Sequence, residues 1–142
     1  MKVKEVMTYG VDFVRPDTNL RDVAQKMRDK NEGALPVFEG EEPVGLVTDR
    51  DIAVRAIAEG KDPASTRARE VMTPQVIFCT EDMELEEAAH IMEYKKIRRL
   101  LVKDEQRHVT GMLSLGDIAT SSPKEFTGEV LQEVIGVAYP ER

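Results

Sequence analysis

The chain has 142 residues, 41% hydrophobic and 33% charged, a composition typical of a folded globular protein rather than a disordered one. No apolar run approaches the roughly 18–20 residues that span a bilayer, and the single cysteine, Cys79, cannot form an intrachain disulfide, so a cytoplasmic protein is expected. The net charge of −7 disfavours nucleic acid as a partner, and an anionic ligand would need cations at its own site.

The chain contains an internal repeat. Glu-Val-Met-Thr at residues 5–8 recurs at residues 70–73, and the correspondence continues with an offset of 65. One extra residue near Gln106 changes the offset to 66, so that Asp51 corresponds to Asp117. A similarity that keeps its register over this length indicates a tandem duplication.

Each copy is predicted to form a strand, a helix, two strands and a second helix. In the first copy these are a strand at 11–14, a helix from Leu20, strands at 35–38 and 44–48, and a helix from Asp49 to about Gly60. In the second copy they are a strand at 76–79, a helix from Leu85, strands at 100–103 and 109–114, and a helix from Leu115. The first helix of each copy has apolar residues spaced i, i+3, i+4 and i+7: Leu20, Val23, Ala24 and Met27, then Leu85, Ala88, Ala89 and Met92. Asn19 stands at the N-cap position of the first of them.

A polar segment between the copies predicts a linker, and a further helix is expected after the second copy. The predicted divisions are 2–60 and 68–122 for the repeats, 61–67 for the linker and 123–142 for a C-terminal helix and tail. Residues 122–125 have a capping-box pattern with proline at the first helical position. The helix is expected to end near Gly136 and to dock on the module or on a second subunit through one apolar face: Phe126, Val130, Leu131, Val134 and Ile135.

These motifs, in this order and present twice, resemble a known family. Val-Met-Thr at the start of each copy, Ala-Leu-Pro-Val at 34–37 and Gly-Leu-Val-Thr-Asp-Arg-Asp-Ile at 45–52 resemble a CBS repeat. The two copies resemble a CBS pair, or Bateman module, of the stand-alone bacterial and archaeal type. The resemblance implies an α+β fold in which two repeats pack about a pseudo-twofold axis, with clefts between them and frequent pairing into homodimers. It also implies a sensor that requires no cofactor, binds AMP, ADP or ATP ahead of NAD or S-adenosylmethionine, and acts on a regulated protein.

Thr48-x-x-Asp51 and Ser114-x-x-Asp117 have two interpretations. A hydroxyl residue followed three residues later by an acid is a helix capping box, which satisfies backbone N–H groups. The same geometry could hold a phosphate at the helix start and accept ribose hydroxyls on the carboxylate. The resemblance implies the second use: the hydroxyl residue contacts phosphate and the aspartate holds ribose.

Four cations lie within five residues in this acidic chain. Lys95 and Lys96 fit the C-terminal end of the preceding predicted helix, where the helix dipole favours positive charge. Arg98 and Arg99 lie just before a predicted strand, where the resemblance implies a basic pair that faces the ligand phosphates. The planar guanidinium suits phosphate oxygens.

The resemblance further implies that each cleft combines the Thr/Ser-x-x-Asp motif of one repeat with strand entries from the other. The cleft of Thr48 and Asp51 would receive the two arginines, with Val76 near the adenine. The cleft of Ser114 and Asp117 would receive only Gly33 and Ala34, with Glu32 nearby. A charged nucleotide is therefore expected to prefer the first cleft. The predicted ligand-binding residues are Thr48, Arg50, Asp51, Val76, Arg98, Arg99, Ser114 and Asp117.

Neither catalysis nor metal binding is predicted. Asp49 and Asp51 are more simply explained as helix-start acids than as metal ligands. His90 and His108 have no Cys, Ser or second His arranged with them, and Cys79, at the end of an apolar run, is expected in the core. The alternative function is a ligand-free dimerisation or protein-interaction module. Nucleic-acid binding is disfavoured by the net charge and by an aromatic content of 5%.

Overall fold

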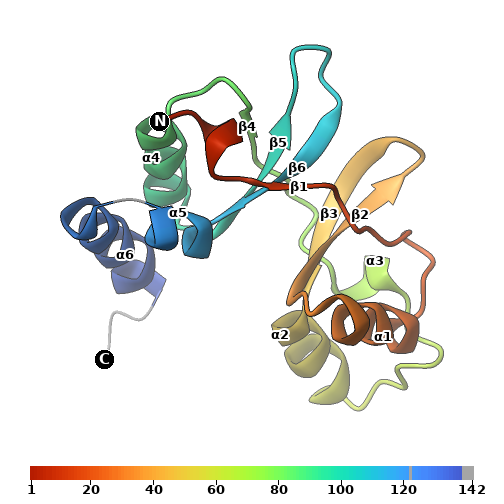
Figure 1. Ribbon diagram of the computed structural model, residues 1–142. Coiled ribbons are helices and arrows are strands. Elements are labelled where there is room, and N and C mark those ends of the chain that lie inside the picture. Colours follow the sequence, from red (N-terminus) through yellow and green to blue (C-terminus); the bar gives the residue numbers. More distant parts are fainter. Residues whose placement is uncertain (122, 139–142) are drawn as a thin grey trace. The chain divides into compact units, whose positions relative to one another are not determined.

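The computed structural model describes residues 1–121 and 123–138, which divide into two compact units (Figure 1). Unit 1 contains residues 1–11 and the described residues from Ile77 onward, and unit 2 contains Asp12–Val76. Each unit is described by itself below. No helix among the described residues is both long and apolar enough to cross a membrane.

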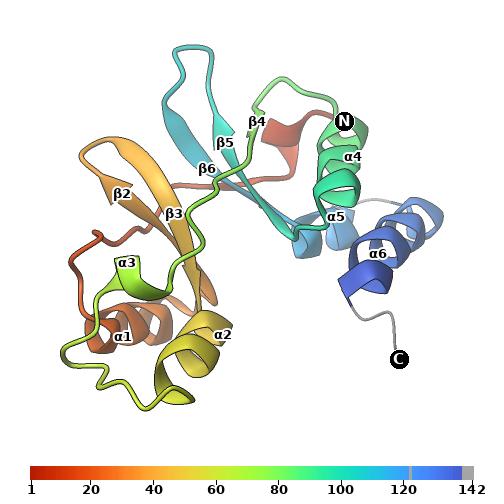
Figure 2. The same cartoon turned by 180° about the vertical axis from the view of Figure 1, so that it is seen from behind.

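Unit 2 is built on a two-stranded antiparallel sheet with helices. Along the chain it contains α1 (Leu20–Lys30), β2 (Ala34–Glu39), β3 (Glu42–Thr48), α2 (Asp49–Ile52), which continues as the π-helical turn η2 (Ala53–Ile57), and α3 (Ala68–Val71). Asn19 is the N-cap of α1, because its side-chain oxygen accepts the Asp22 N–H at 2.9 Å. Figure 2 shows α3 beside β3, which it contacts.

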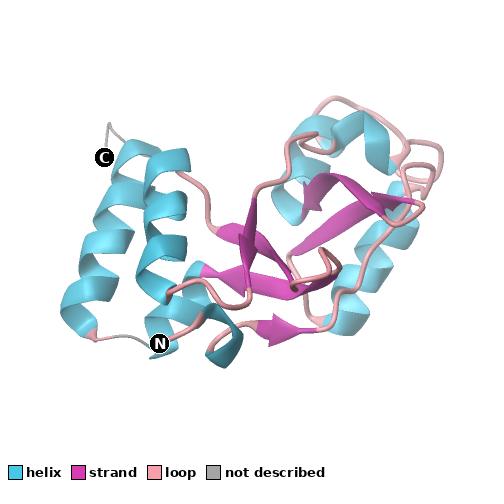
Figure 3. Cartoon of the chain, turned by 90° about the horizontal axis from the view of Figure 1, so that it is seen from above, coloured by secondary structure: helices cyan, strands magenta, loops and turns pink. Residues whose placement is uncertain are grey.

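Unit 1 repeats the helix, strand, strand, helix order of unit 2 and has further elements and a four-stranded sheet. It contains the 3-10 turn η1 (Val3–Glu5), β1 (Thr8–Tyr9), β4 (Phe78–Thr80), α4 (Leu85–Lys95), β5 (Arg99–Lys103), β6 (Val109–Ser114), α5 (Leu115–Ser121) and α6 (Lys124–Ala138). The strand order is β1-β6-β5-β4, in which only the β5–β4 pair is parallel. The predicted mixed α+β class is confirmed (Figure 3).

The duplication is visible in the backbone of the two units. The bounds of α1 and α4 differ by 65 residues at both ends, and each helix is followed by a left-handed residue, Asn31 at φ 54° and Lys96 at φ 57°. The strand pairs correspond as well, since Ala34 faces Thr48 and Arg99 faces Ser114. The repeated sequence therefore produces a repeated fold.

Some sequence-based predictions are wrong in detail. The strand expected at 11–14 is a single bridge at Val14. The Val14 N–H donates to Pro36 O and the Val14 carbonyl accepts the Phe38 N–H, and the chain leaves β2 after these two hydrogen bonds. The strand expected from Val76 begins at Phe78. The C-terminal helix continues through Gly136 to Ala138, because one glycine weakens a helix without ending it. Ser122 of the predicted capping box lies outside the described residues.

The C-terminal helix docks on its own unit. Val130 and Val134 are 0% and 1% exposed, and α6 contacts α4 and α5 (Figures 1 and 2). This position explains why Ala89 of α4 is buried, whereas Ala24, predicted on the apolar face of α1, is exposed. In the described part of unit 2, no helix covers α1 as α6 covers α4.

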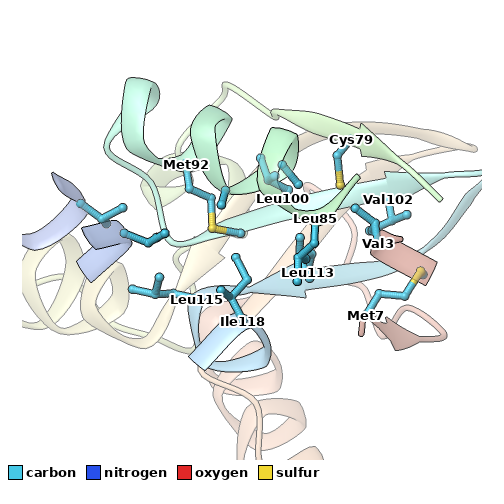
Figure 4. Close-up of a cluster of buried hydrophobic side chains, with 14 residues drawn as sticks. Val3, Met7, Cys79, Leu85, Met92, Leu100, Val102, Leu113, Leu115 and Ile118 are labelled. Atoms are coloured by element: carbon cyan, nitrogen blue, oxygen red, sulfur yellow. The ribbon is translucent and has the colours of Figure 1, made fainter. Parts of the chain in front are cut away.

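Each unit has its own apolar core. In unit 1, side chains from α4, β5, β6 and α5 meet, among them Met92, Leu100, Leu113 and Ile118 (Figure 4). Val3 and Met7, from the start of the chain, complete this core. In unit 2, Ala68 and Val71 belong to the core in the same way.

The Val-Met-Thr segments are exchanged between the repeats. Thr8, at the start of the first repeat, pairs with Met112 on β6 of the second repeat's sheet. Thr73, at the start of the second repeat, pairs with Leu46 on β3 of the first repeat's sheet. Glycine makes both approaches possible: a Cβ at Gly45 would lie 2.8 Å from Thr73 O, and one at Gly111 would overlap Thr8 O. Neither repeat therefore completes its sheet from its own sequence.

Candidate functional site

The first predicted motif is a complete capping box at the start of α2. The Asp51 N–H donates to Thr48 Oγ1 at 3.0 Å, and the Thr48 N–H donates to Asp51 Oδ2 at 2.9 Å. Asp51 is 9% exposed, and it is the one charged residue that is buried among the residues that the structure describes. The capping interpretation of the motif is thus confirmed, and it holds the carboxylate in a fixed position.

The second motif reproduces this geometry in unit 1. The Asp117 N–H donates to Ser114 Oγ at 3.0 Å, and the Ser114 N–H donates to Asp117 Oδ2 at 2.9 Å. The preceding backbone also corresponds, since Asp49 N donates to Gly33 O at 3.0 Å and Leu115 N donates to Arg98 O at 2.8 Å. The duplicated sequence thus places the same hydroxyl and carboxylate groups at the same point of each unit.

Arg55 is a charged residue of the first site that the sequence motifs did not single out. Its Nε lies 3.8 Å from Asp51 Oδ1, and a guanidinium N–H donates to the carbonyl of Val71 at 3.1 Å. The sequence signal that could have identified Arg55 is its i, i+4 spacing from Asp51 on one helical segment. The corresponding residue of the second repeat is Ser121, so the two sites differ in local charge.

Arg98 and Arg99 lie at the strand entry beside the second motif. Arg99 begins β5 opposite Ser114, and the Arg98 carbonyl accepts the N–H of Leu115. Within unit 1 the structure thus brings this basic pair next to Ser114. Their predicted association with Thr48 and Asp51 stays a prediction.

The remaining predicted residues have less distinctive positions. Arg50 is exposed in α2, where its N–H donates to Asp49 Oδ1 at 2.8 Å, and Val76 is half-buried at the end of unit 2. Asp49 itself begins α2, as expected of a helix-start acid. Lys95 lies in the last turn of α4, which confirms the helix-end interpretation, and Lys96 caps that helix and donates to Glu133 O of α6 at 2.9 Å.

The position of Cys79 does not suit a nucleophile. Its side chain is 1% exposed within the core of unit 1, as predicted, and burial raises the pKa of the thiol to about 12. A reactive cysteine instead needs a depressed pKa and solvent access. Among the described residues, no three His, Cys, Asp or Glu side chains lie together as a candidate metal site.

The raised pKa of Cys79 predicts a loss of stability at alkaline pH. The unfolded thiol ionises near pH 9.0 but the folded thiol only near pH 12, so the unfolded state releases a proton first and gains stability between these values. The free energy of unfolding should fall with pH in this window, by at most about 1.4 kcal/mol per unit from this group. Denaturant unfolding at several pH values, compared with Cys79→Ala, measures the effect. Parallel pH profiles of the two proteins would contradict it.

Comparison with known proteins identifies what the chain resembles as a whole. A family model described as the CBS domain matches residues 3–57 and 68–124. The CBS domain-containing protein YhcV of Bacillus subtilis is 37% identical over 133 residues, which cover 93% of this chain and 94% of that protein.

Two solved structures extend the likeness to three dimensions. A crystal structure of Hypoxic Response Protein I with two coordinated zinc ions has a TM-score of 0.74 and 30% identity, and the match covers 87% of this chain and all of that one. A crystal structure of CBSX2 in complex with AMP has a TM-score of 0.69 and 25% identity, and the match covers 84% of this chain and 94% of that one.

Proposed function

The chain belongs to the CBS-domain family as a tandem pair, a regulatory module, and we propose from this premise that it senses an adenosine-containing ligand of the AMP, ADP or ATP class. The Thr48–Asp51 and Ser114–Asp117 motifs would hold this ligand. Threonine or serine would contact phosphate, and aspartate would accept the ribose hydroxyls.

The observation that carries the proposal is the fixed carboxylate of each motif, which is buried at Asp51 and half-buried at Asp117. Asp51 and Asp117 each use Oδ2 to accept a backbone N–H, which fixes the side chain before any ligand arrives. A preorganised acceptor loses little conformational entropy on binding. The AMP complex of CBSX2, a structure similar to this chain, supports the choice of ligand class.

Charge supports a preference for the first site. In a chain of net charge −7, a phosphorylated ligand needs a local cation, and Arg55 already lies beside Asp51 within unit 2. Ser121, at the corresponding position of the second repeat, supplies no charge, but Arg98 and Arg99 lie at the strand entry beside Ser114. We propose that the charged nucleotide binds first at Thr48 and Asp51, where Arg55 is held, and first binding at Ser114 and Asp117 would instead show that the basic pair serves its own unit.

Isothermal titration calorimetry with adenosine, AMP, ADP, ATP, NAD and S-adenosylmethionine tests the proposal. We expect heat from at least one adenine nucleotide and stronger binding of the phosphorylated forms than of adenosine. No heat from any of them would reject the proposal and favour a ligand-free interaction module.

Arg98→Ala tests whether Arg98 contacts the phosphates of the ligand. Loss of a charge-assisted hydrogen bond to phosphate costs about 1.5 kcal/mol or more, so ATP affinity should fall by about tenfold while adenosine affinity stays unchanged. Equal losses for ATP and adenosine would indicate a structural role. Arg107→Ala, which removes an exposed cation from the β5–β6 turn, is the matched control.

Double mutants then assign the cation to one aspartate. If Arg98 and Asp51 contact the same ligand, the effects of Arg98→Ala and Asp51→Asn should not add, whereas those of Arg98→Ala and Asp117→Asn should. The reverse pattern would assign the arginine to the site of its own unit, beside Ser114, and contradict the predicted pairing.

A further inference from the structure

Equivalent phenylalanines of the two repeats have different surroundings. The offset of 65 pairs Phe13 with Phe78, and Phe38 with Lys103. The backbone supports the second pair, because the strand register shifts immediately before each of these residues in β2 and β5. The two phenylalanines thus occupy one position of the repeat, and their neighbours can be compared directly.

In unit 2 this ring is covered by a second aromatic ring and by a guanidinium group. The ring centroids of Phe13 and Phe38 lie 5.2 Å apart, and Arg15 Cζ lies 4.8 Å from the Phe13 centroid. Arg15 also donates to Phe38 O at 3.1 Å. A guanidinium over an aromatic face is a favourable cation–π arrangement. Unit 2 therefore supplies its own arginine to the ring.

In unit 1 the equivalent ring borders an open hollow instead. Thr80 stands where unit 2 has Arg15, and Lys103 stands where it has an aromatic residue. The hollow has a volume of about 580 Å³ and is lined by residues of β4, including Phe78, and of the β5–β6 turn (Figure 1). The Lys103 ammonium lies 3.7 Å from the Phe78 centroid, so this ring also accepts a cation.

The charge of the hollow favours a cationic group. Its lining contains two cations and four carboxylates: Lys103 and Arg107, with Glu81, Asp82, Asp104 and Glu105. Glu81 accepts the Thr110 hydroxyl at 2.6 Å and Asp82 pairs with Lys4 Nζ at 2.9 Å, whereas Glu105 is exposed in the turn. An aromatic face beside carboxylates suits a guanidinium, whose plane stacks on the ring while its N–H groups donate to carboxylate oxygens.

We propose that the hollow of unit 1 binds a guanidinium group, which lies on Phe78 as Arg15 lies on the equivalent ring. The exposed carboxylate of Glu105 is its acceptor. Lys103 O already accepts the Glu81 N–H at 3.0 Å, so the ring and the carboxylate hold the group in place of the backbone carbonyl that Arg15 uses. The guanidinium comes from an arginine side chain of a partner polypeptide or from free arginine, which share this chemistry. The inference is independent of nucleotide binding.

NMR titration of the isotope-labelled full chain at constant ionic strength tests the proposal. The probes are L-arginine, the peptide acetyl-Gly-Arg-Gly-amide and the matched peptide acetyl-Gly-Lys-Gly-amide. We expect saturable shifts of the amides at 78–82 and 103–107, with a millimolar Kd for at least one guanidinium probe. The lysine peptide should bind at least about threefold more weakly, because an ammonium has no plane to stack on the ring. Tighter binding of the arginine peptide than of L-arginine identifies a partner's side chain as the source, and the reverse identifies free arginine.

Single substitutions locate the site. Phe78→Leu keeps an apolar side chain but removes the aromatic face, so the guanidinium affinity should fall by about two- to fivefold. Glu105→Gln removes the charge of the proposed acceptor and should lower the affinity by at least about threefold. Phe13→Leu, the same change at the equivalent position of the first repeat, is the matched control. It should leave the affinity unchanged, because Arg15 and Phe38 already cover that ring.

Lys103→Met provides a test in the opposite direction. It removes the ammonium that competes for the Phe78 ring, so the affinity should rise by about two- to fivefold, a gain that a damaged fold would not produce. Several results would overturn the proposal: no saturable shift from either guanidinium probe, a lysine peptide that binds as tightly as the arginine peptide, equal affinities of Phe78→Leu and the wild-type chain, or a lower affinity of Lys103→Met.

Discussion

Asp51→Asn is expected to weaken binding of an adenine nucleotide by about tenfold or more while leaving the fold intact. The asparagine side chain keeps one oxygen that can accept the Thr48 N–H, so the cap at the start of α2 is retained. It loses the negative charge and one of the two acceptor oxygens, which the proposed ribose contact requires. Calorimetric titration and thermal unfolding of the same variant separate the two roles.

Asp117→Asn is the matched substitution at the same point of the second repeat. If the charged ligand prefers the first site, Asp117→Asn should change the affinity of the tighter binding event much less than Asp51→Asn. Unchanged affinity in Asp51→Asn, in a chain that does bind nucleotide, would leave Asp51 with the capping role alone. A larger effect from Asp117→Asn would transfer the preferred site to unit 1.

Gly111→Ala is expected to cost about 3 kcal/mol of stability and to lower the Tm by about 6–12 °C. A Cβ at this position would overlap the Thr8 carbonyl oxygen and would lie 2.5 Å from Met7 Cε. β1 pairs with β6 at this point and Met7 belongs to the unit 1 core. The added methyl group would therefore push β1 away from β6 and displace Met7 from the core. Differential scanning calorimetry measures both the midpoint and the enthalpy.

Gly128→Ala in α6 is the control for this prediction. A Cβ at Gly128 meets nothing within 4 Å, and alanine favours a helix over glycine by up to about 1 kcal/mol. This substitution should therefore leave the Tm unchanged or raise it. A Gly111→Ala protein as stable as the wild type would mean that β1 does not need its close approach to β6.

The sequence by itself determined the local features of this protein. Hydrophobic spacing and a capping asparagine located α1 from Leu20, and the repeat offset transferred that prediction to α4 without change. The Thr/Ser-x-x-Asp motifs form capping boxes, which is one of the two interpretations that the sequence left open. These features depend on residues within a few positions of each other, so periodicity and cap chemistry are sufficient to predict them.

The tertiary structure decided where each segment is used. No local pattern shows that Thr8 joins β6 and that Thr73 pairs with β3, because a strand of one or two residues has no periodicity of its own. Ala24 and Ala89 occupy the same helical phase, yet only Ala89 is buried, because α6 covers α4. Arg55 lies beside Asp51 because of their i, i+4 spacing, but it reaches the Val71 carbonyl only because α3 packs against β3. Burial and pairing between distant segments depend on the whole fold, which local propensity does not encode.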